Sequence, residues 1–328
     1  MKVIGGLSHI HGLSLALGFF DGIHTGHAVV IKNAVKCAKI YNTQSGVILF
    51  RKHPRETFTG VKNENILEFN EKLNMLNRLG VDYVFLLDFN EDFAKMTAQD
   101  YLENVILPYF QPVAITTGFN HTFGLRGEGN PDLLKKYSED FGFKYFQVPP
   151  ITTKNTLISS TTIKNAIKNS NFELARDLLG YGFYIKSPVI HGRKIGRTIN
   201  FPTANLIYPE ELIKIERGVY FVIVSTNRKN YRGVMNYGLR PTVEMGDIIA
   251  VPEVHLLDFS GNLYGNIVKV SPIAKIREER PFKSLSELKE QITKDSEFAA
   301  NYQLGEPQRE KRTMLIPEHT KVPSPDFL

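Results

Sequence analysis

The sequence predicts an α/β domain with a doubly wound parallel sheet, followed by an antiparallel β-barrel that ends in a helix. Three observations carry this prediction. Apolar strand-like runs alternate with helix-like segments through the first 180 residues, and short β-rich runs separated by Gly, Pro and Asn follow from residue 181. A helical pattern returns after Ser284. The chain has 328 residues, which is enough for two hydrophobic cores.

The first half alternates strand-like and helix-like segments. The apolar runs fall at 13–20, 45–50, 81–88, 112–117 and, more briefly, 143–148. Helical spacing is found at 28–38, 70–79 and 98–105. A last helix is expected from the hydroxyl-rich segment at 158–164, which suits an N-cap, through residue 179 to Gly180, which suits a C-cap. This order predicts parallel strands joined by right-handed crossovers.

The second half contains five short strand-like runs, at 183–190, 218–226, 231–237, 253–258 and 267–276. Strands of this length and spacing are typical of an antiparallel barrel. Leu285, Leu288 and Ile292 then follow Ser284 at helical spacing and predict the terminal helix. We therefore expect one domain at 1–180, a second at 181–303, and an extended tail of unassigned role at 304–328.

The composition is that of an ordinary globular protein, with a formal net charge of +6 that suits nucleotides, RNA or membrane surfaces alike. Cys37 is the only cysteine, so no intrachain disulfide can form and a buried thiol is expected. No apolar run approaches the roughly 18 residues that span a bilayer, and the first residues lack a signal-peptide pattern. These features predict a cytoplasmic protein.

A glycine-rich turn with two histidines joins the first apolar run to the first helix. Gly22 and Gly26 permit a close approach of the backbone, and the start of the helix offers unpaired N–H groups to an anion. His24 and His27 bracket the position where a phosphate would lie and can donate to its oxygens. The segment therefore predicts a nucleotide-phosphate site, and the alternative is a plain turn with two surface histidines. The remaining candidate contacts in this segment are Gly18, Phe20 and Asp21.

A basic loop at 191–206 in the second half is the other candidate phosphate site. Its glycines and certain positive charges are Gly192, Arg193, Lys194, Gly196 and Arg197. Thr203 and Asn205, two residues apart after Pro202, offer hard oxygens on the same side, and Mg²⁺ prefers such ligands. No G-x-x-x-x-G-K-[ST] motif occurs, which argues against a P-loop fold. The alternative is a basic β-turn that binds nothing.

Both segments resemble motifs of the bacterial bifunctional riboflavin kinase/FAD synthetase family. Residues 18–27 are similar to its G-x-F-D-G-x-H-x-G-H signature, and the basic loop is similar to its G-R-x-x-G-F-P-T-A-N motif. Three further segments resemble I-S-S-T-x-[IV]-R, G-V-x-N-x-G-x-R-P-T and E-x-H-L-L-D-F, at 158–164, 233–242 and 253–259. The motifs occur in the family's order, and the resemblance implies a Rossmann-like nucleotidyltransferase domain of the HxGH type before a riboflavin kinase barrel.

The resemblance also implies two reactions with ATP as co-substrate. In the barrel, riboflavin is phosphorylated to FMN, with Mg²⁺ held by Thr203 and Asn205. Glu253 would act there as general base on the ribityl hydroxyl, whereas its alternative is a cross-strand partner for Lys or Arg. In the first domain, FMN attacks the α-phosphorus of ATP and yields FAD and pyrophosphate, with Lys164 stabilising the transition state beside the two histidines.

Further contacts follow from the same resemblance. Ser160 and Thr161 are expected at a phosphate, and the flavin-binding candidates are Asn120, Phe123 and Arg240. Three residues depart from the family pattern: Lys164 replaces an Arg, His121 an aromatic residue, and Asn200 a Gly. Lysine keeps the charge of arginine but lacks the planar fork that binds phosphate oxygens bidentately.

Two alternatives stay open. The chain could be a riboflavin kinase with a weak or inactive adenylyltransferase domain, because of Lys164 and His121. It could instead be a non-enzymatic flavin- or RNA-binding regulator, a hypothesis motivated by the net charge and the tail. The main interpretation expects small-molecule partners, namely ATP, riboflavin and FMN, without nucleic acid or membrane, and it leaves the oligomeric state undefined.

Overall fold

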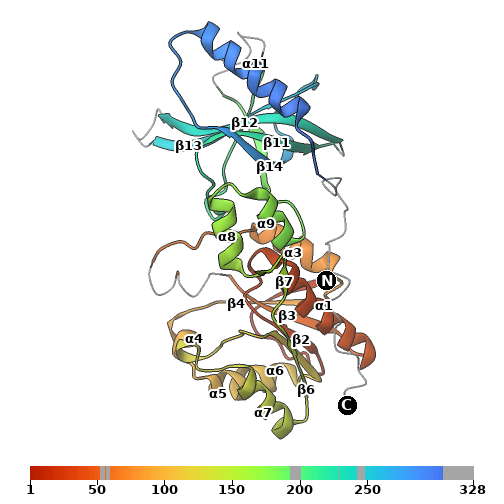
Figure 1. Ribbon diagram of the computed structural model, residues 1–328. Helices are drawn as coiled ribbons and strands as arrows, with labels where there is room; N and C mark the ends of the chain where they lie inside the picture. Colours follow the sequence, from red (N-terminus) through yellow and green to blue (C-terminus); the bar gives the residue numbers. More distant parts are fainter. Residues whose placement is uncertain (52–55, 57–59, 193–200, 228, 242–247, 306–328) are drawn as a thin grey trace. The chain divides into compact units, whose positions relative to one another are not determined.

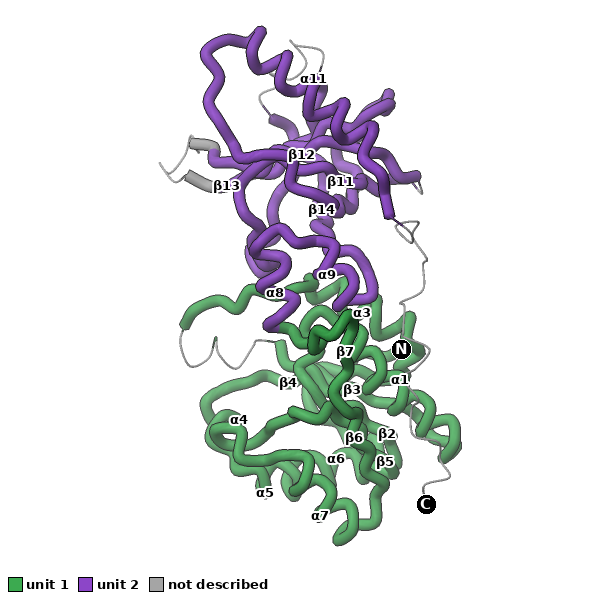
Figure 2. The backbone as a smooth tube through the Cα atoms, viewed as in Figure 1, with its two compact units in different colours: residues 1–160, 315–328 green, residues 161–314 purple. Residues whose placement is uncertain are grey.

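The computed structural model describes residues 1–51, 56, 60–192, 201–227, 229–241 and 248–305, without the side chains of 240, 241, 248 and 249. The described residues form two compact units, residues 1–160 and residues 161 onward, which Figure 2 colours green and purple. The first unit contains a parallel sheet and the second a closed barrel. The expected order of the two architectures is therefore confirmed.

The sheet of the first unit has six parallel strands in the order β1-β4-β3-β2-β5-β6. Their bounds are β1 (Lys2–Gly5), β2 (Ser14–Leu17), β3 (Ser45–Phe50), β4 (Tyr83–Leu87), β5 (Ala114–Gly118) and β6 (Lys144–Val148). The edge strand β1 was not expected from the sequence, because it is short and largely exposed and therefore lacks an apolar run. The first predicted run was too long, since β2 ends at Leu17 and a turn begins there.

Helices cover both faces of this sheet (Figure 1). One face carries α1 (Thr25–Ile40), which is anchored to the sheet by a buried hydrogen bond from Asn33 Nδ2 to Thr116 Oγ1 of 3.1 Å. The other carries α5 (Ala98–Tyr101), η2 (Leu102–Ile106), α6 (Leu107–Phe110) and α7 (Pro131–Phe141), whose apolar side chains pack on β2, β3, β4 and β5. The chain also forms α3 (Phe69–Arg78) before β4 and α4 (Glu91–Lys95) after it.

The strand order places a switch point at β2. The chain leaves β2 through α1 for β3 on one side, whereas β5 lies on the other side of β2. In open α/β sheets, ligands bind at the carboxyl ends of strands at such a point. The two segments that follow β2 and β5 are residues 18–27 and 119–130, which are the two loops that the sequence singles out in this half.

A hairpin of β7 (Thr152–Thr153) and β8 (Thr156–Leu157) leads to two helices, α8 (Ser160–Lys168) and α9 (Phe172–Leu179). The single helix expected from 160 to 179 was wrong. Ser170 adopts a left-handed backbone (φ 55°), and the side chain of Asn171 caps a new helix by accepting the N–H of Leu174 at 3.1 Å. The expected end at Gly180 is confirmed, with φ 79°.

The second unit closes six antiparallel strands into a barrel of order β10-β13-β12-β11-β14-β9. The strands are β9 (Ile185–Ile190), β10 (Ala204–Leu206), β11 (Gly218–Thr226), β12 (Lys229–Pro241), β13 (Ile248–Leu256) and β14 (Ile267–Arg277). Five of them match predicted runs. The sixth, β10, has three residues, too few to produce an alternating pattern, and it closes the barrel between β9 and β13.

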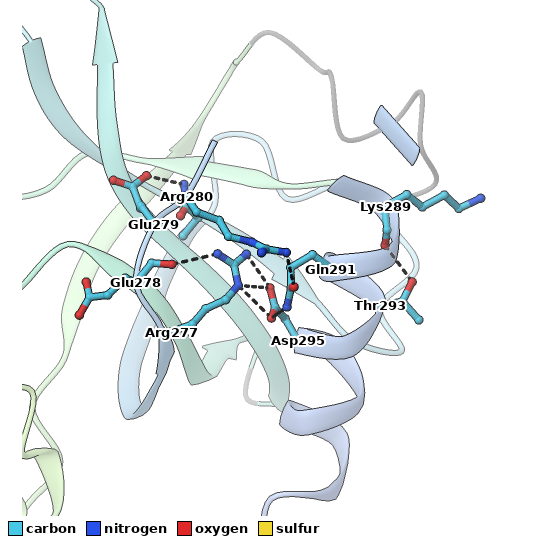
Figure 3. A network of polar contacts seen from close by, with 9 residues as sticks. Arg277, Glu278, Glu279, Arg280, Lys289, Gln291, Thr293 and Asp295 are labelled. Atoms are coloured by element: carbon cyan, nitrogen blue, oxygen red, sulfur yellow. Dashed lines mark hydrogen bonds and ion pairs between the residues drawn. The ribbon is translucent and has the colours of Figure 1, made fainter. Parts of the chain in front are cut away.

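The expected terminal helix is α11 (Leu285–Asn301), which begins after Ser284, whose hydroxyl accepts the N–H of Glu287 at 3.1 Å. A polar network joins α11 to the end of β14 (Figure 3). Arg277 donates to both carboxylate oxygens of Asp295, from Nε at 3.1 Å and from Nη2 at 2.8 Å, and the Asp295 side chain is only 2% exposed. Such a paired, buried charge ties the helix to the barrel.

We expect Asp295→Asn to destabilise the second unit by about 3 kcal/mol, because it leaves a partly buried guanidinium without its counter-charge. Thermal or urea unfolding, followed by circular dichroism, measures the loss. Glu290→Gln is the matched control, since Glu290 forms a pair with Lys294 on the exposed face of the same helix, and it should change the transition little. Equal stability of both variants would show that the Arg277 pair does not hold the helix.

Candidate active sites

The turn after β2 has an unusual backbone. Phe20 (φ 50°), Gly22 (φ 74°) and Ile23 (φ 38°) all lie in the left-handed region, and two of them are not glycine. Such residues cost on the order of 1–3 kcal/mol each and persist where packing holds them. The side chains of Phe20 and Ile23 are 1% and 0% exposed, so the core holds this turn in shape.

His24 and His27 lie together at the start of α1. Their rings stack with centroids 3.6 Å apart and an interplanar angle of 15°. The N–H of His27 donates to Nδ1 of His24 at 3.2 Å, so His24 caps the helix through that nitrogen. Because Nδ1 accepts, the proton of the neutral ring is on Nε2, which is left as a donor. A side chain at Gly26 would lie 3.2 Å from the His24 ring, so the glycine leaves room for the ring.

Both histidines are neutral in the free protein at neutral pH. Burial lowers the pKa of His24 to about 4. Burial, with the nearby His24 and Lys72, lowers the pKa of His27 well below its usual value. Among the described residues, Nδ1 of His27 is buried without a hydrogen-bond partner. His24 therefore offers Nε2–H as a neutral hydrogen-bond donor, and the His27 ring, which also hydrogen-bonds to the backbone of Asp21, is neutral beside it.

These lowered pKa values predict that the protein loses stability in mild acid. Below pH 6.5 these two histidines bind protons in the unfolded chain but stay neutral in the folded protein. Their contribution to the free energy of unfolding should therefore fall from pH 6.5 toward pH 4 and stay level above 6.5. The expected slope is about 1.4 kcal/mol per pH unit for each histidine. Urea unfolding at several pH values measures it. His24→Asn should reduce the slope, and an unchanged slope would contradict the assignment.

Asp21 and Gly22 connect this turn to other segments. Oδ1 of Asp21 accepts the N–H of Ile66 at 2.9 Å, and its carbonyl accepts the hydroxyl of Ser160 at 3.4 Å. A side chain at Gly22 would lie 2.9 Å from the Ile66 side chain. The predicted phosphate contacts Asp21, Gly22 and Ser160 are therefore brought together with the histidine turn. Gly18 lies at the start of the same turn, against the Phe20 ring.

The loop after β5 is held closed by its own backbone. Phe123 and Gly129 exchange two hydrogen bonds, of 3.2 and 2.9 Å. Gly124 (φ 73°) lies so close to the start of α5 that a side chain there would be 2.4 Å from the backbone nitrogen of Ala98. Asn120 is exposed at the tip. The two flavin candidates of this loop, Asn120 and Phe123, therefore stand on a rigid support.

His121 occupies the position where the family has an aromatic residue, and its ring stacks on Phe123 at 5.7 Å and 20°. Burial lowers the pKa of His121 to about 4, so the ring is neutral at neutral pH. A neutral, stacked imidazole substitutes for an aromatic ring in packing. The ring of His121 therefore packs in this loop as an aromatic side chain would.

A chain of touching aromatic rings follows the carboxyl edge of the sheet, and the sequence analysis missed most of it. Successive ring centroids are 5.2 to 5.8 Å apart. The members, which we call the aromatic edge, are Phe19, Phe50, Phe89, Phe93, Tyr101 and Phe123. Several of them stand at or just after the ends of β2, β3 and β4. An aromatic residue at each of these strand ends is the sequence pattern that could have predicted the cluster. Such a surface suits a planar ring system.

Thr161 and Lys164 lie on α8. The boundary between the compact units falls directly after Ser160, so Ser160 belongs to the unit of the histidines and Thr161 and Lys164 belong to the unit of the barrel. The structure brings Ser160 to the histidine turn, as described above. It does not by itself join Lys164 to that turn.

In the barrel, Glu253 stands in a row of polar side chains. It is in register with Asn205 of β10 on one side and with Asn236 of β12 on the other, so the three side chains point to the same face. The hydroxyl of Thr203 donates to Oε2 of Glu253 at 3.4 Å. The candidate base and the two candidate Mg²⁺ ligands, Thr203 and Asn205, are thus brought together.

Gly192 lies directly against this row. A side chain there would come within 2.2 Å of Nδ2 of Asn205, so only glycine fits beside that amide. Next to it, His191 stacks on Tyr264 with ring centroids 4.0 Å apart. The predicted phosphate contacts Arg193, Gly196 and Arg197 lie outside the described residues, as does the side chain of Arg240.

An open cleft of about 370 Å³ lies on the barrel, lined by charged side chains: Glu216, Arg217, Lys275, Glu278 and Glu279. Lys275 pairs with Glu216 at 2.8 Å and with Glu278 at 2.6 Å. Oε1 of Glu279 accepts from Nδ2 of Asn236 at 3.5 Å, which connects the cleft to the polar row. Within the described residues, no three His, Cys, Asp or Glu side chains gather as a metal site.

The comparisons with known proteins cover both units. The FAD synthetase family model matches residues 7–162, and the riboflavin kinase family model matches residues 179–303. Among curated proteins, the chain is 37% identical over 306 residues to the bifunctional riboflavin kinase/FMN adenylyltransferase of Haemophilus influenzae, covering 91% of this chain and 98% of that protein. The enzyme of the same name from Bacillus subtilis is 36% identical over 293 residues, covering 88% and 92%.

Among solved structures, the chain is similar to a crystal structure described as a macrolide-efflux protein from Streptococcus pneumoniae. The TM-score is 0.82 at 32% identity, and the match covers 92% of this chain and all of that one. The similarity therefore extends through both units of the fold. In the part of the chain that the structure describes, no helix combines the length and apolar composition needed to cross a bilayer.

Proposed function

Because the chain belongs to the family of bifunctional riboflavin kinases/FMN adenylyltransferases, we propose that it carries the family's two active sites at the two places described above. The chain phosphorylates riboflavin to FMN and adenylylates FMN to FAD, with ATP as co-substrate of both reactions. The observation that supports the placement best is the joint position of His24 and His27 at the switch point of the sheet, with Glu253, Thr203 and Asn205 forming a separate cluster on the barrel.

In the kinase site, Glu253 accepts the proton of the terminal ribityl hydroxyl as that oxygen forms its bond to the γ-phosphorus of ATP. The bond from this phosphorus to the bridging oxygen breaks, and ADP leaves. The oxygens of Thr203 and Asn205 suit Mg²⁺, and they lie beside the carboxylate that must stay near the reacting hydroxyl. When bound, Mg²⁺ would neutralise phosphate charge.

In the adenylyltransferase site, a phosphate oxygen of FMN attacks the α-phosphorus of ATP, and pyrophosphate leaves. Nε2–H of His24 donates to the phosphate oxygens on which charge develops, and His27 supports this donor through its stacked ring. The family resemblance assigns Lys164 a further positive charge in this reaction. No covalent intermediate with the enzyme is required, because positioning and electrostatics are sufficient.

The aromatic edge provides the surface for the isoalloxazine ring in this site. Phe19 is 42% exposed and Phe50 is partly buried, so part of the surface is open to a ligand. At the far end, Phe123 belongs to the same loop as Asn120, whose exposed amide offers a hydrogen bond to the flavin. The planar rings of the aromatic edge and the amide of Asn120 support this assignment, because a flavin offers a planar ring system and hydrogen-bonding atoms.

The domain boundary proposed for these activities follows Gly180, where α9 ends. The first domain would hold the adenylyltransferase, residues 181–303 the kinase, and residues 304–328 an extended tail, most of which lies outside the described residues. The proposal also keeps a cytoplasmic location, and small molecules rather than nucleic acid as partners.

One assay tests this function against its two rivals. The purified chain is incubated with riboflavin, ATP and Mg²⁺, and the flavins are separated by chromatography. Accumulation of both FMN and FAD is expected. FMN without FAD would favour a kinase with an inactive first domain, and Lys164→Arg would then be tested for recovery of FAD. No turnover, with salt-sensitive RNA binding, would favour the regulator.

A further inference from the structure

His255 makes a contact that no proposed role uses. It stands two residues after Glu253 on β13, so both side chains emerge on the same face of the barrel. Its Nδ1 lies 2.9 Å from the carbonyl oxygen of Pro202, and its ring meets the ring of Phe201 edge to face at 5.2 Å and 75°. The residue after this carbonyl is Thr203, the candidate Mg²⁺ ligand.

The chemistry of this contact defines the direction of the hydrogen bond. A carbonyl oxygen only accepts, so Nδ1 of His255 carries the proton and donates. Pro202 has no backbone N–H, so the backbone at this position cannot donate a hydrogen bond to a neighbouring strand. The His255 bond anchors the chain next to the β10 register pair of Ala204 with Val254.

The anchored segment is the one that presents the kinase oxygens. Thr203 reaches Oε2 of Glu253 at 3.4 Å, and Asn205 is in register with Glu253. A loss of the anchor would let Thr203 move away from the carboxylate while β10 stays paired. Side chains that orient metal ligands without touching the metal typically matter: their mutation lowers metal affinity or activity about 10- to 100-fold.

We propose that His255 is a positioning residue of the kinase site. It holds the Pro202–Thr203 backbone so that the Thr203 oxygen meets the divalent cation beside the Glu253 carboxylate that accepts the ribityl proton. The proposal rests on the proposed kinase site, because it gives Thr203 and Glu253 their roles. His255 itself touches neither substrate nor metal in it.

Two substitutions separate the hydrogen bond from the packing of the ring. His255→Phe keeps a planar ring against Phe201 and removes the donor. His255→Asn loses the ring but places an amide N–H near the position of Nδ1. The readouts are kcat of FMN formation and the Mg²⁺ concentration that gives half of the maximal rate, with FAD formation from supplied FMN and the thermal unfolding temperature measured alongside.

We expect His255→Phe to raise the half-maximal Mg²⁺ concentration about tenfold and to lower kcat at limiting Mg²⁺, with recovery at high Mg²⁺. His255→Asn should stay within about threefold of the unsubstituted chain, and both should form FAD from FMN normally. Tyr231→Ala is the matched control, because it removes a similar edge-to-face contact, with Phe259 at 5.2 Å, elsewhere on the barrel.

The outcomes distinguish the alternatives. A normal Mg²⁺ dependence of His255→Phe would overturn the positioning role. So would a weakened Mg²⁺ response in His255→Asn together with a normal one in His255→Phe, because only the packing of the ring would then matter. Failure of the kinase-site assignment has a different signature, since Glu253→Gln would then form FMN at a normal rate whatever His255 does. Equal unfolding temperatures of the two His255 variants would exclude misfolding as the cause of a difference between them.

Discussion

We expect Glu253→Gln to lower FMN formation severely and to leave the conversion of supplied FMN to FAD intact. The substitution preserves size and hydrogen-bonding capacity but removes the group that accepts the ribityl proton. A positioned general base contributes typically about 10²- to 10⁴-fold, so FMN formation should fall by that factor. The register of β13 with β10 and β12 keeps the side chain in the polar row, so the effect is chemical rather than structural.

The measurement is the initial rate of each reaction, started from riboflavin or from FMN with ATP and Mg²⁺. Glu290→Gln is a control with the same change in charge on α11, and it should leave both rates unchanged. A parallel fall of both activities in Glu253→Gln would refute the separation of the two sites. Full activity with riboflavin would remove Glu253 from the mechanism.

His24→Asn should lower FAD formation from FMN by about 10²- to 10³-fold, the effect typical of removing one preorganised donor. Asparagine is among the best N-cap residues, so its side-chain oxygen can replace Nδ1 as acceptor of the His27 N–H and keep α1 capped. It cannot extend a donor to the position of Nε2. The variant therefore isolates the hydrogen bond to phosphate from the capping role.

The rates are measured at saturating FMN and ATP, with circular dichroism as a check of the helix. His11→Asn provides the control, since His11 is an exposed histidine of the same unit, and FMN formation from riboflavin should be normal in both variants. If His24→Asn made FAD at the original rate, the histidine turn would be a structural cap only. A loss of both activities would point to general misfolding.

Much of the fold could be predicted because it follows from local periodicity. The β3 run is flanked by polar residues and buried on both faces, and β11 is a long and mostly buried run rich in β-branched and aromatic residues, so the strands at 45–50 and 218–226 were found with their bounds. The missed strands β1 and β10 have four and three residues, too few for a pattern. The break at Ser170 was missed because left-handed residues outside glycine have no reliable sequence signal.

The candidate sites divide in the same way. Glycines and histidines at close spacing, such as Gly22, His24 and Gly26, could be read from the chain because one turn holds them all. The aromatic edge could not, since Phe50 and Phe93 look like ordinary core residues until β3 and α4 bring them into contact at 5.2 Å. The hydrogen bond from His255 to Pro202 joins segments far apart in the chain, so it could not be predicted from the sequence either.

By itself, the sequence determined the two architectures, the order of the two chemistries and the residue types at each phosphate site, because these depend on periodicity and on short motifs. Only the tertiary structure decided which groups act together. Strand register placed Glu253 between Asn205 and Asn236, and burial lowered the pKa values of His24 and His27. Register and burial arise from contacts between distant segments, and no local pattern encodes those contacts.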